Sequence, residues 1–180
     1  MNNAGFGDHG PFVQGDPQRI TDMIQVNVTA LTDLCRLYLP AMLKNRSGQI
    51  LNVASTAAFQ PGPLMSEYYA TKAYVLHFTE GLAEEIKDSG VTVTALCPGP
   101  TTSGFQKAAN LVDVPLFDLM KVPDSKEVAE YAYKAMQQGK VIAIHGLLNY
   151  ITATTVGFLP RVMARRTAMR LQQKRLKPKD

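Results

Sequence analysis

The sequence predicts an α/β fold in which a parallel sheet is flanked by helices. Three short apolar segments, beginning near residues 49, 91 and 141, have the composition of buried strands. Segments with apolar residues at helical spacing separate them. Strands that alternate with helices form parallel sheets with right-handed crossovers, and ligands bind beyond the carboxyl ends of such strands. The length of 180 residues and the 46% hydrophobic content fit one globular fold.

The N-terminal part predicts a turn followed by a long helix. Residues 2–7 are rich in Asn and Gly, which is typical of a turn. Asp16 and Pro17 predict the N-cap and first residue of a helix over 17–44, either continuous or broken in two. The second part of this helix has apolar residues at helical spacing: Leu31, Leu34, Leu37, Tyr38 and Met42.

The middle of the chain predicts a strand–helix–strand unit. A buried strand over 49–55 ends at a serine, and a helix is expected over 67–88 with Ser89-Gly90 as its C-terminal cap. A second buried strand over 91–97 ends at a proline–glycine turn. The carboxyl ends of both strands therefore meet at one rim of the sheet.

The C-terminal part predicts a loop, a helix, a strand and a helical tail. Residues 101–123 are irregular, and Ser125 is expected to cap a helix over 125–138. A third short strand is expected over 141–145, and the tail that follows is apolar first and basic later.

The composition limits the classes of function. Cys35 and Cys97 lie in apolar segments, so we expect buried free thiols and a reducing cytoplasm. No apolar run reaches the length of a membrane span, no secretory signal is expected at the N-terminus, and no Cys/His grouping has metal-ligand spacing. Residues 161–180 hold eight basic residues and one acidic residue, so the net charge of +4 comes from the tail and does not predict nucleic-acid binding.

Tyr68 and Lys72 lie four residues apart, which places them on one helical face. An ammonium group beside a phenol favours the phenolate, so such a tyrosine could act as an acid or base. This spacing alone is common by chance. The joint order and spacing of its companions are much harder to assign to chance: Asn2-Asn3-Ala4-Gly5, Asn27, Ser55 and Pro98-Gly99.

With these residues, the chain resembles the short-chain dehydrogenase/reductase family over residues 1–145. The resemblance implies the C-terminal part of a doubly wound, Rossmann-like fold over 1–146, followed by a helical extension with a basic tail over 147–180. The matching motifs are Asn2-Asn3-Ala4-Gly5, Asn27, Ser55, Tyr68-x-x-x-Lys72 and Pro98-Gly99. Tyr69 neighbours the motif, but the spacing to Lys72 selects Tyr68.

The resemblance implies an oxidoreductase that moves hydride between a nicotinamide and a carbonyl or hydroxyl group. Tyr68 would transfer the proton, and Lys72 would lower its pKa and bind the nicotinamide ribose. Ser55 would hold the substrate oxygen, and Asn27 would anchor a water linked to Lys72. The cofactor would be NADP or NAD, with NADP favoured, and its contacts would be Asn2, Ala4, Gly5, Tyr68, Lys72, Pro98, Gly99, Thr101 and Thr102.

The chain departs from the family's pattern in one respect. The family's Thr-Gly-x-x-x-Gly-x-Gly turn, which binds the cofactor pyrophosphate, is missing from this sequence. We therefore expect an N-terminally truncated chain with an exposed edge at the strand over 49–55 and poor affinity for NAD(P). The alternative function is a catalytically inactive remnant that acts at most as an association module.

The sequence and the family resemblance also predict the partners of this chain. The loop over 101–123 predicts either an apolar substrate wall or a lid, through Phe105, Leu111, Val112, Val114, Leu116, Phe117, Leu119 and Met120. The expected substrate is a small apolar carbonyl compound or alcohol. A homo-oligomer would form through helices 17–44 and 67–88, as in the family. The basic tail is either a helix that caps the substrate pocket, which we favour, or an interfacial membrane helix.

Overall fold

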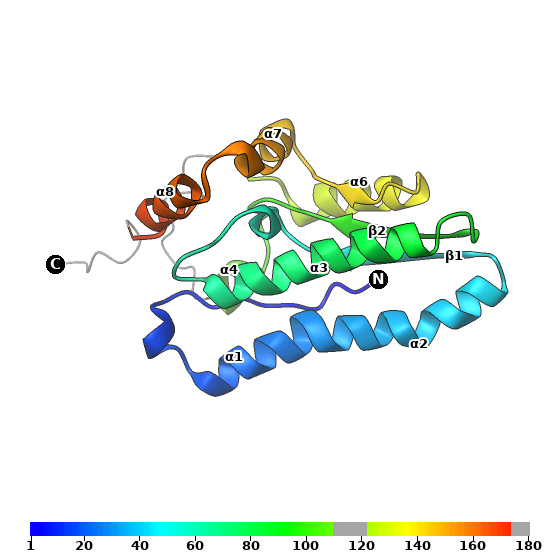
Figure 1. Ribbon diagram of the computed structural model, residues 1–180, viewed down its shortest axis with the longest axis horizontal. Helices are drawn as coiled ribbons and strands as arrows, with labels where there is room; N and C mark the ends of the chain where they lie inside the picture. Colours follow the sequence, from blue (N-terminus) through cyan, green and yellow to red (C-terminus); the bar gives the residue numbers. More distant parts are fainter. Residues whose placement is uncertain (110–121, 174–180) are drawn as a thin grey trace.

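Three parallel strands form the centre of the fold (Figure 1). The computed structural model describes residues 1–109 and 122–173. The strands are β1 (Gly48–Val53), β2 (Val91–Leu96) and β3 (Ile142–Ala143), in the order β1-β2-β3. Both neighbouring pairs are parallel, with Gly48 opposite Val91 and Val53 opposite Leu96. The predicted α/β fold with a parallel sheet is confirmed.

Helices cover both faces of this sheet. Successive strand residues point to opposite faces, so Ile50 packs in the cluster that includes α2 and α3, whereas Leu51 packs against α6. The helices on the first face are α2 (Leu31–Lys44) and α3 (Ser66–Glu85), and α6 (Ser125–Gln137) covers the second. The helix α1 (Pro17–Ile24) precedes α2, and its Met23 packs in a separate cluster with Tyr68.

The helix expected over 17–44 is continuous but not uniform. Asp16 caps it, because its carboxylate accepts a 2.9 Å hydrogen bond from the amide of Gln18, and Pro17 is the first helical residue as predicted. Between α1 and α2 the backbone becomes a π-helical segment, η2 (Gln25–Ala30). Such wide turns are frequent at functional sites, and Asn27 is the buried residue of this one.

Two helix ends differ from the prediction. α3 ends at Glu85, three residues before the predicted end. It cannot extend to Asp88, because that residue adopts a left-handed φ of 63° that a right-handed helix does not contain. Ser89-Gly90 is therefore not its cap; Gly90 instead has a φ of 86° and packs where a Cβ would collide with the Arg46 carbonyl. Asp124 takes the N-cap position of α6, and the predicted cap, Ser125, is the first helical residue.

Short elements and two C-terminal helices complete the described part. The short helices are η1 (Phe12–Gln14), η3 (Thr56–Phe59), α4 (Phe105–Ala108) and η4 (Val156–Phe158). The C-terminal helices are α7 (Leu147–Thr155) and α8 (Arg161–Gln173). Every helix within 1–109 and 122–173 is too short or too polar to cross a bilayer.

The N-terminal segment lies beside the outer edge of β1. Asn2 forms a parallel bridge with Asn52: its amide donates to the Leu51 carbonyl at 2.8 Å, and its carbonyl accepts from the Val53 amide at 3.0 Å. In the described part of the chain, this bridge is the only β pairing on that edge of β1. Cys35 and Cys97 are both buried and free, as predicted.

Candidate active site

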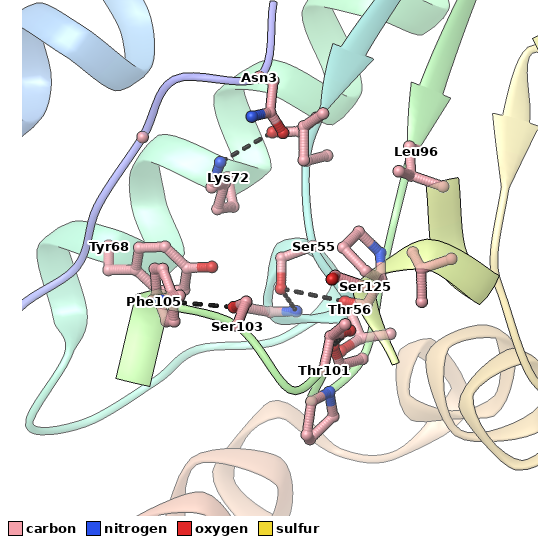
Figure 2. A pocket seen from close by; sticks show the side chains of 18 of the residues that line it. Asn3, Ser55, Thr56, Tyr68, Lys72, Leu96, Thr101, Ser103, Phe105 and Ser125 are labelled. Atoms are coloured by element: carbon pink, nitrogen blue, oxygen red, sulfur yellow. Dashed lines mark hydrogen bonds between the residues drawn. The ribbon is translucent and has the colours of Figure 1, made fainter. Parts of the chain in front are cut away.

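A cavity of about 670 Å³ lies at the carboxyl ends of β1 and β2 (Figure 2). Elements far apart in the sequence meet there: the N-terminal segment, both strand ends, the first turns of α3, and α4, α6 and α8. The predicted residues that line the cavity are Gly5, Ser55, Tyr68, Lys72, Pro98, Gly99 and Thr101.

Ser55 is held just beyond the end of β1. Its hydroxyl oxygen accepts a 3.1 Å hydrogen bond from the amide of Ala57 and donates to the Pro98 carbonyl at 3.4 Å. The first bond caps the short helix η3. The Ser55 hydroxyl is therefore fixed between the two strand ends and faces Tyr68 (Figure 2).

Tyr68 lies in the first turn of α3 and is only 8% exposed. Burial raises the pKa of its phenol to about 12, because the phenolate is poorly solvated there, and a hydrogen bond with Ser55 opposes this rise. The lowering of this pKa by Lys72, which the resemblance implies, is not among the causes of the shift in this structure. Desolvation is the larger effect, and the Lys72 ammonium nitrogen lies 5.8 Å from the centre of the ring.

Lys72 lies one helical turn after Tyr68 and is 5% exposed. Its ammonium group donates a 2.7 Å hydrogen bond to the carbonyl of Val53, at the end of β1. Burial lowers its pKa to about 8, since the charged form loses solvation. The side chain is thus mostly protonated at neutral pH and close to its titration midpoint.

The low pKa of Lys72 gives a direct prediction. In protein labelled with [13Cε]lysine, one resonance is expected to titrate with a midpoint near pH 8, and that resonance should be missing from Lys72→Met. The pKa of Lys72 is about 8 in the folded chain and 10.5 in the unfolded chain, so the unfolded chain binds more protons between pH 8 and 10.5. The contribution of Lys72 therefore becomes less destabilising as the pH rises from 8 to 10.5. A midpoint near 10.5 for that resonance would contradict the assignment.

Asn27 does not line the cavity and is 1% exposed. Its side-chain oxygen accepts from the Phe6 amide at 3.1 Å, and its nitrogen donates to the Phe6 carbonyl at 2.9 Å and to the Thr71 hydroxyl at 3.0 Å. These contacts indicate that Asn27 fastens the N-terminal segment to α3. The water-anchoring role implied by the resemblance stays a prediction. A Cβ on Gly5 would lie 2.9 Å from the Asn27 oxygen and 3.4 Å from the Lys72 nitrogen, so only glycine lets this segment approach so closely.

Three predicted cofactor contacts do not line the cavity: Asn2, Ala4 and Thr102. The Asn2 side chain instead donates to the Asn52 oxygen at 2.8 Å, inside the sheet edge. Thr102 forms an isolated bridge with Asp124. Thr101 does line the cavity, and its hydroxyl donates to the Gly99 carbonyl at 3.0 Å.

Several lining residues were not predicted as site residues, namely Asn3, Thr56, Tyr69, Ser103 and Gln172. Thr56 and Ser103 lie within a few residues of predicted positions, so strand-end proximity could have indicated them. Nothing in the sequence places Gln172 there.

Among the apolar residues predicted to matter in the loop over 101–123, Phe105 lines the cavity, and its ring centre lies 5.2 Å from that of Tyr68. The choice between a substrate wall and a lid stays open, because the other apolar residues of this loop lie outside the described residues. They are Leu111, Val112, Val114, Leu116, Phe117, Leu119 and Met120. The described residues contain no cluster of three metal-ligating side chains.

The chain resembles known proteins along most of its length. The family model for short chain dehydrogenases matches residues 1–112. An uncharacterised oxidoreductase of Staphylococcus saprophyticus is 34% identical over 161 residues, which is 87% of this chain and 62% of that protein. A very-long-chain 3-oxoacyl-CoA reductase of Danio rerio is 31% identical over 137 residues, covering 75% of this chain and 42% of that protein.

Solved structures agree with these relatives. A short-chain dehydrogenase from Sphingobium yanoikuyae in complex with NADPH has a TM-score of 0.74 and 31% identity, covering 87% of this chain and 62% of that one. An alcohol dehydrogenase from Comamonas testosteroni, specific for bulky-bulky ketones, has a TM-score of 0.69 and 29% identity over 86% of this chain and 58% of that one. The chain thus spans less than two thirds of the length of these proteins. Its family-model match, its relatives and its parallel sheet together show that it belongs to the short-chain dehydrogenase family.

Proposed function

We propose that this chain carries the catalytic part of an NAD(P)-dependent oxidoreductase, which transfers hydride between a nicotinamide and a carbonyl or hydroxyl group. The observation that carries this proposal is the meeting of Ser55, Tyr68 and Lys72 at one cavity beyond the strand ends. Family membership supports it, as do the NADPH held by the relative from Sphingobium yanoikuyae and the NADP held by one from Burkholderia cenocepacia.

The residues have distinct roles in this proposal. Tyr68, protonated at neutral pH because of its raised pKa, donates a proton to the substrate oxygen during reduction. Ser55 holds that oxygen by a hydrogen bond, since its hydroxyl faces Tyr68. Lys72 holds a positive charge beside Tyr68 and stabilises the phenolate that remains after proton transfer. The nicotinamide, when bound, supplies or accepts the hydride.

The cavity fits the nicotinamide end of the cofactor. Gly5 and Gly99 line it without side chains of their own, and the Lys72 ammonium offers donors to a ribose hydroxyl. NADP is favoured over NAD, on the support of the relatives that bind it.

The substrate class follows from the lining. Apart from the polar side chains already named, the wall is made by apolar groups such as Met65, Val53 and Phe105. We therefore propose a carbonyl compound or alcohol with an apolar body.

Association with a second copy is also proposed. α2 and α3 leave large apolar side chains exposed, namely Leu34, Leu37, Tyr38 and Tyr74. Burial of such side chains is favourable, and this supports a homo-oligomer formed through helices 17–44 and 67–88.

The test is a fluorescence titration of the purified chain with NADPH and NADH. We expect saturable binding of both, tighter for NADPH, and turnover of apolar ketones with the nucleotide that binds. Tyr74→Phe, altered outside the cavity, should behave as the unmodified chain does. A folded chain that binds neither nucleotide would contradict the proposal and favour the alternative, an inactive module that only associates.

A further inference from the structure

Gln172 stands apart from the other residues of α8. Most side chains of this helix are exposed, but Gln172 is only 5% exposed and lines the cavity. The small residues Ala164 and Ala168 lie on the same face, at intervals of four, and are also buried. α8 therefore packs inward along one stripe, and Gln172, at the end of that stripe, lines the cavity.

The side chain next to Gln172 is Tyr69, the immediate neighbour of Tyr68. The Gln172 amide nitrogen lies 3.5 Å from the Tyr69 hydroxyl oxygen, at the outer limit of a hydrogen bond. The Tyr69 ring stands edge-on to Tyr68, with 6.1 Å between ring centres and an interplanar angle of 79°. Gly62 packs so closely on the Tyr69 ring that a Cβ there would collide with it.

Tyr69 is thus held by three neighbours, namely Tyr68, Gly62 and Gln172, and its hydroxyl lies beside the Gln172 amide. An ordered aromatic ring that ends in a hydroxyl beside an amide presents both hydrogen-bond donors and acceptors. Polar groups are costly in an apolar, desolvated wall unless they are hydrogen-bonded. Among the polar side chains that line the cleft, Tyr68 and Ser55 form one pair and Tyr69 and Gln172 form another.

We propose that Tyr69 and Gln172 determine substrate specificity by binding a second oxygen-bearing group, separate from the carbonyl that reacts at Tyr68. The preferred substrate class is an apolar ketone with a further carbonyl, ester or hydroxyl oxygen, in preference to a simple ketone. The inference rests on the proposed function for the carbonyl that reacts at Tyr68. The contact of the second oxygen with Tyr69 and Gln172 affects ligand binding, which can be measured without turnover.

The experiment compares one pair of ligands matched in chain length, an aliphatic oxo ester and the corresponding simple ketone. Binding is measured by ligand-observed NMR in the presence of NADPH, and turnover in parallel by NADPH absorbance. The variants are Tyr69→Phe and Gln172→Leu, which remove hydrogen-bonding groups and keep the shape. The controls are Tyr74→Phe, which removes a hydroxyl on the same helix as Tyr69 that lies 2.9 Å from the Thr32 hydroxyl on α2, and Thr167→Ala on the exposed side of α8.

We expect the unmodified chain to bind the oxo ester about tenfold more tightly than the ketone, which corresponds to one good hydrogen bond. Each variant should lose most of that preference through weaker binding of the oxo ester, while binding of the ketone and the two controls stay unchanged. If Gln172→Leu does not fold, Tyr69→Phe decides alone.

Equal binding of the two ligands by the unmodified chain overturns the inference, whether or not the chain turns over. A preference that survives in Tyr69→Phe overturns it as well. Selective binding that the variants lose, in a chain without turnover, supports the inference and rejects the proposed function, so the two are separable.

Discussion

Tyr68→Phe is expected to lower kcat for ketone reduction by about 10³-fold, the range that a general acid contributes. The substitution removes the proton that the substrate oxygen must receive and leaves the ring in place against Phe105 and Tyr69. The free energy of unfolding should change by no more than about 1 kcal/mol, because the variant loses only the hydrogen bond with Ser55. Stopped-flow measurement of hydride transfer and urea denaturation check the two halves of this prediction.

The raised pKa of Tyr68 adds a pH dependence to the same experiment. With a pKa of about 12 in the chain itself, the phenol is protonated at neutral pH and is ready to donate during reduction. Oxidation of an alcohol needs the phenolate, so its rate should rise with pH up to that pKa. Tyr68→Phe should remove this rise. Retained turnover in Tyr68→Phe, or a pH profile unchanged by it, would remove Tyr68 from its role.

Asn27→Ala is expected to lower the free energy of unfolding by about 3 kcal/mol, since buried hydrogen-bonding groups lose their partner. The Phe6 amide, the Phe6 carbonyl and the Thr71 hydroxyl each bond to the Asn27 side chain, which is almost fully buried. Binding of NADPH should weaken too, because the segment that carries Gly5 to Lys72 loses its attachment to α3.

Urea denaturation measures the loss, and Asn45→Ala is the matched control. Asn45 is exposed at the C-terminal end of α2, so its replacement should change stability by a few tenths of a kcal/mol. If Asn27→Ala were as stable as Asn45→Ala, the fastening role would be wrong. If it were unstable but bound NADPH unchanged, the N-terminal segment would not contribute to the cofactor site.

The strands and long helices could be predicted because their signals are local. Asp16-Pro17 fixes the start of a helix, and apolar runs of strand length fix β1 and β2. The end of α3 could not be predicted, because it depends on a left-handed turn at Asp88 that the sequence does not mark. The π-helical turn could not be predicted either. The sequence only left open whether the helix over 17–44 is continuous or broken in two.

The site divides in the same way. Ser55, Tyr68 and Lys72 could be chosen because strand ends and helical spacing bring them to one rim. Gln172 could not, because it lies 103 residues from Tyr69 in the sequence and only the packing of α8 brings them together. Tyr69 could not be identified either, because the spacing to Lys72 selects the helical face of Tyr68. It does not show that the adjacent side chain contacts Gln172.

The π-helical turn at Gln25–Ala30 also bears on how the length of this protein can vary. A π turn contains one residue more than an α turn, so deletion of one residue within it leaves a regular α-helix with α1 and α2 still in phase. The same deletion elsewhere in 17–44 would rotate one half of the helix by about 100° against the core. The helix can therefore lose a residue at Asn27 and stay folded, but it would no longer direct an amide toward Phe6. The wide turn is the place where evolution could remove the function of this helix without removing the helix.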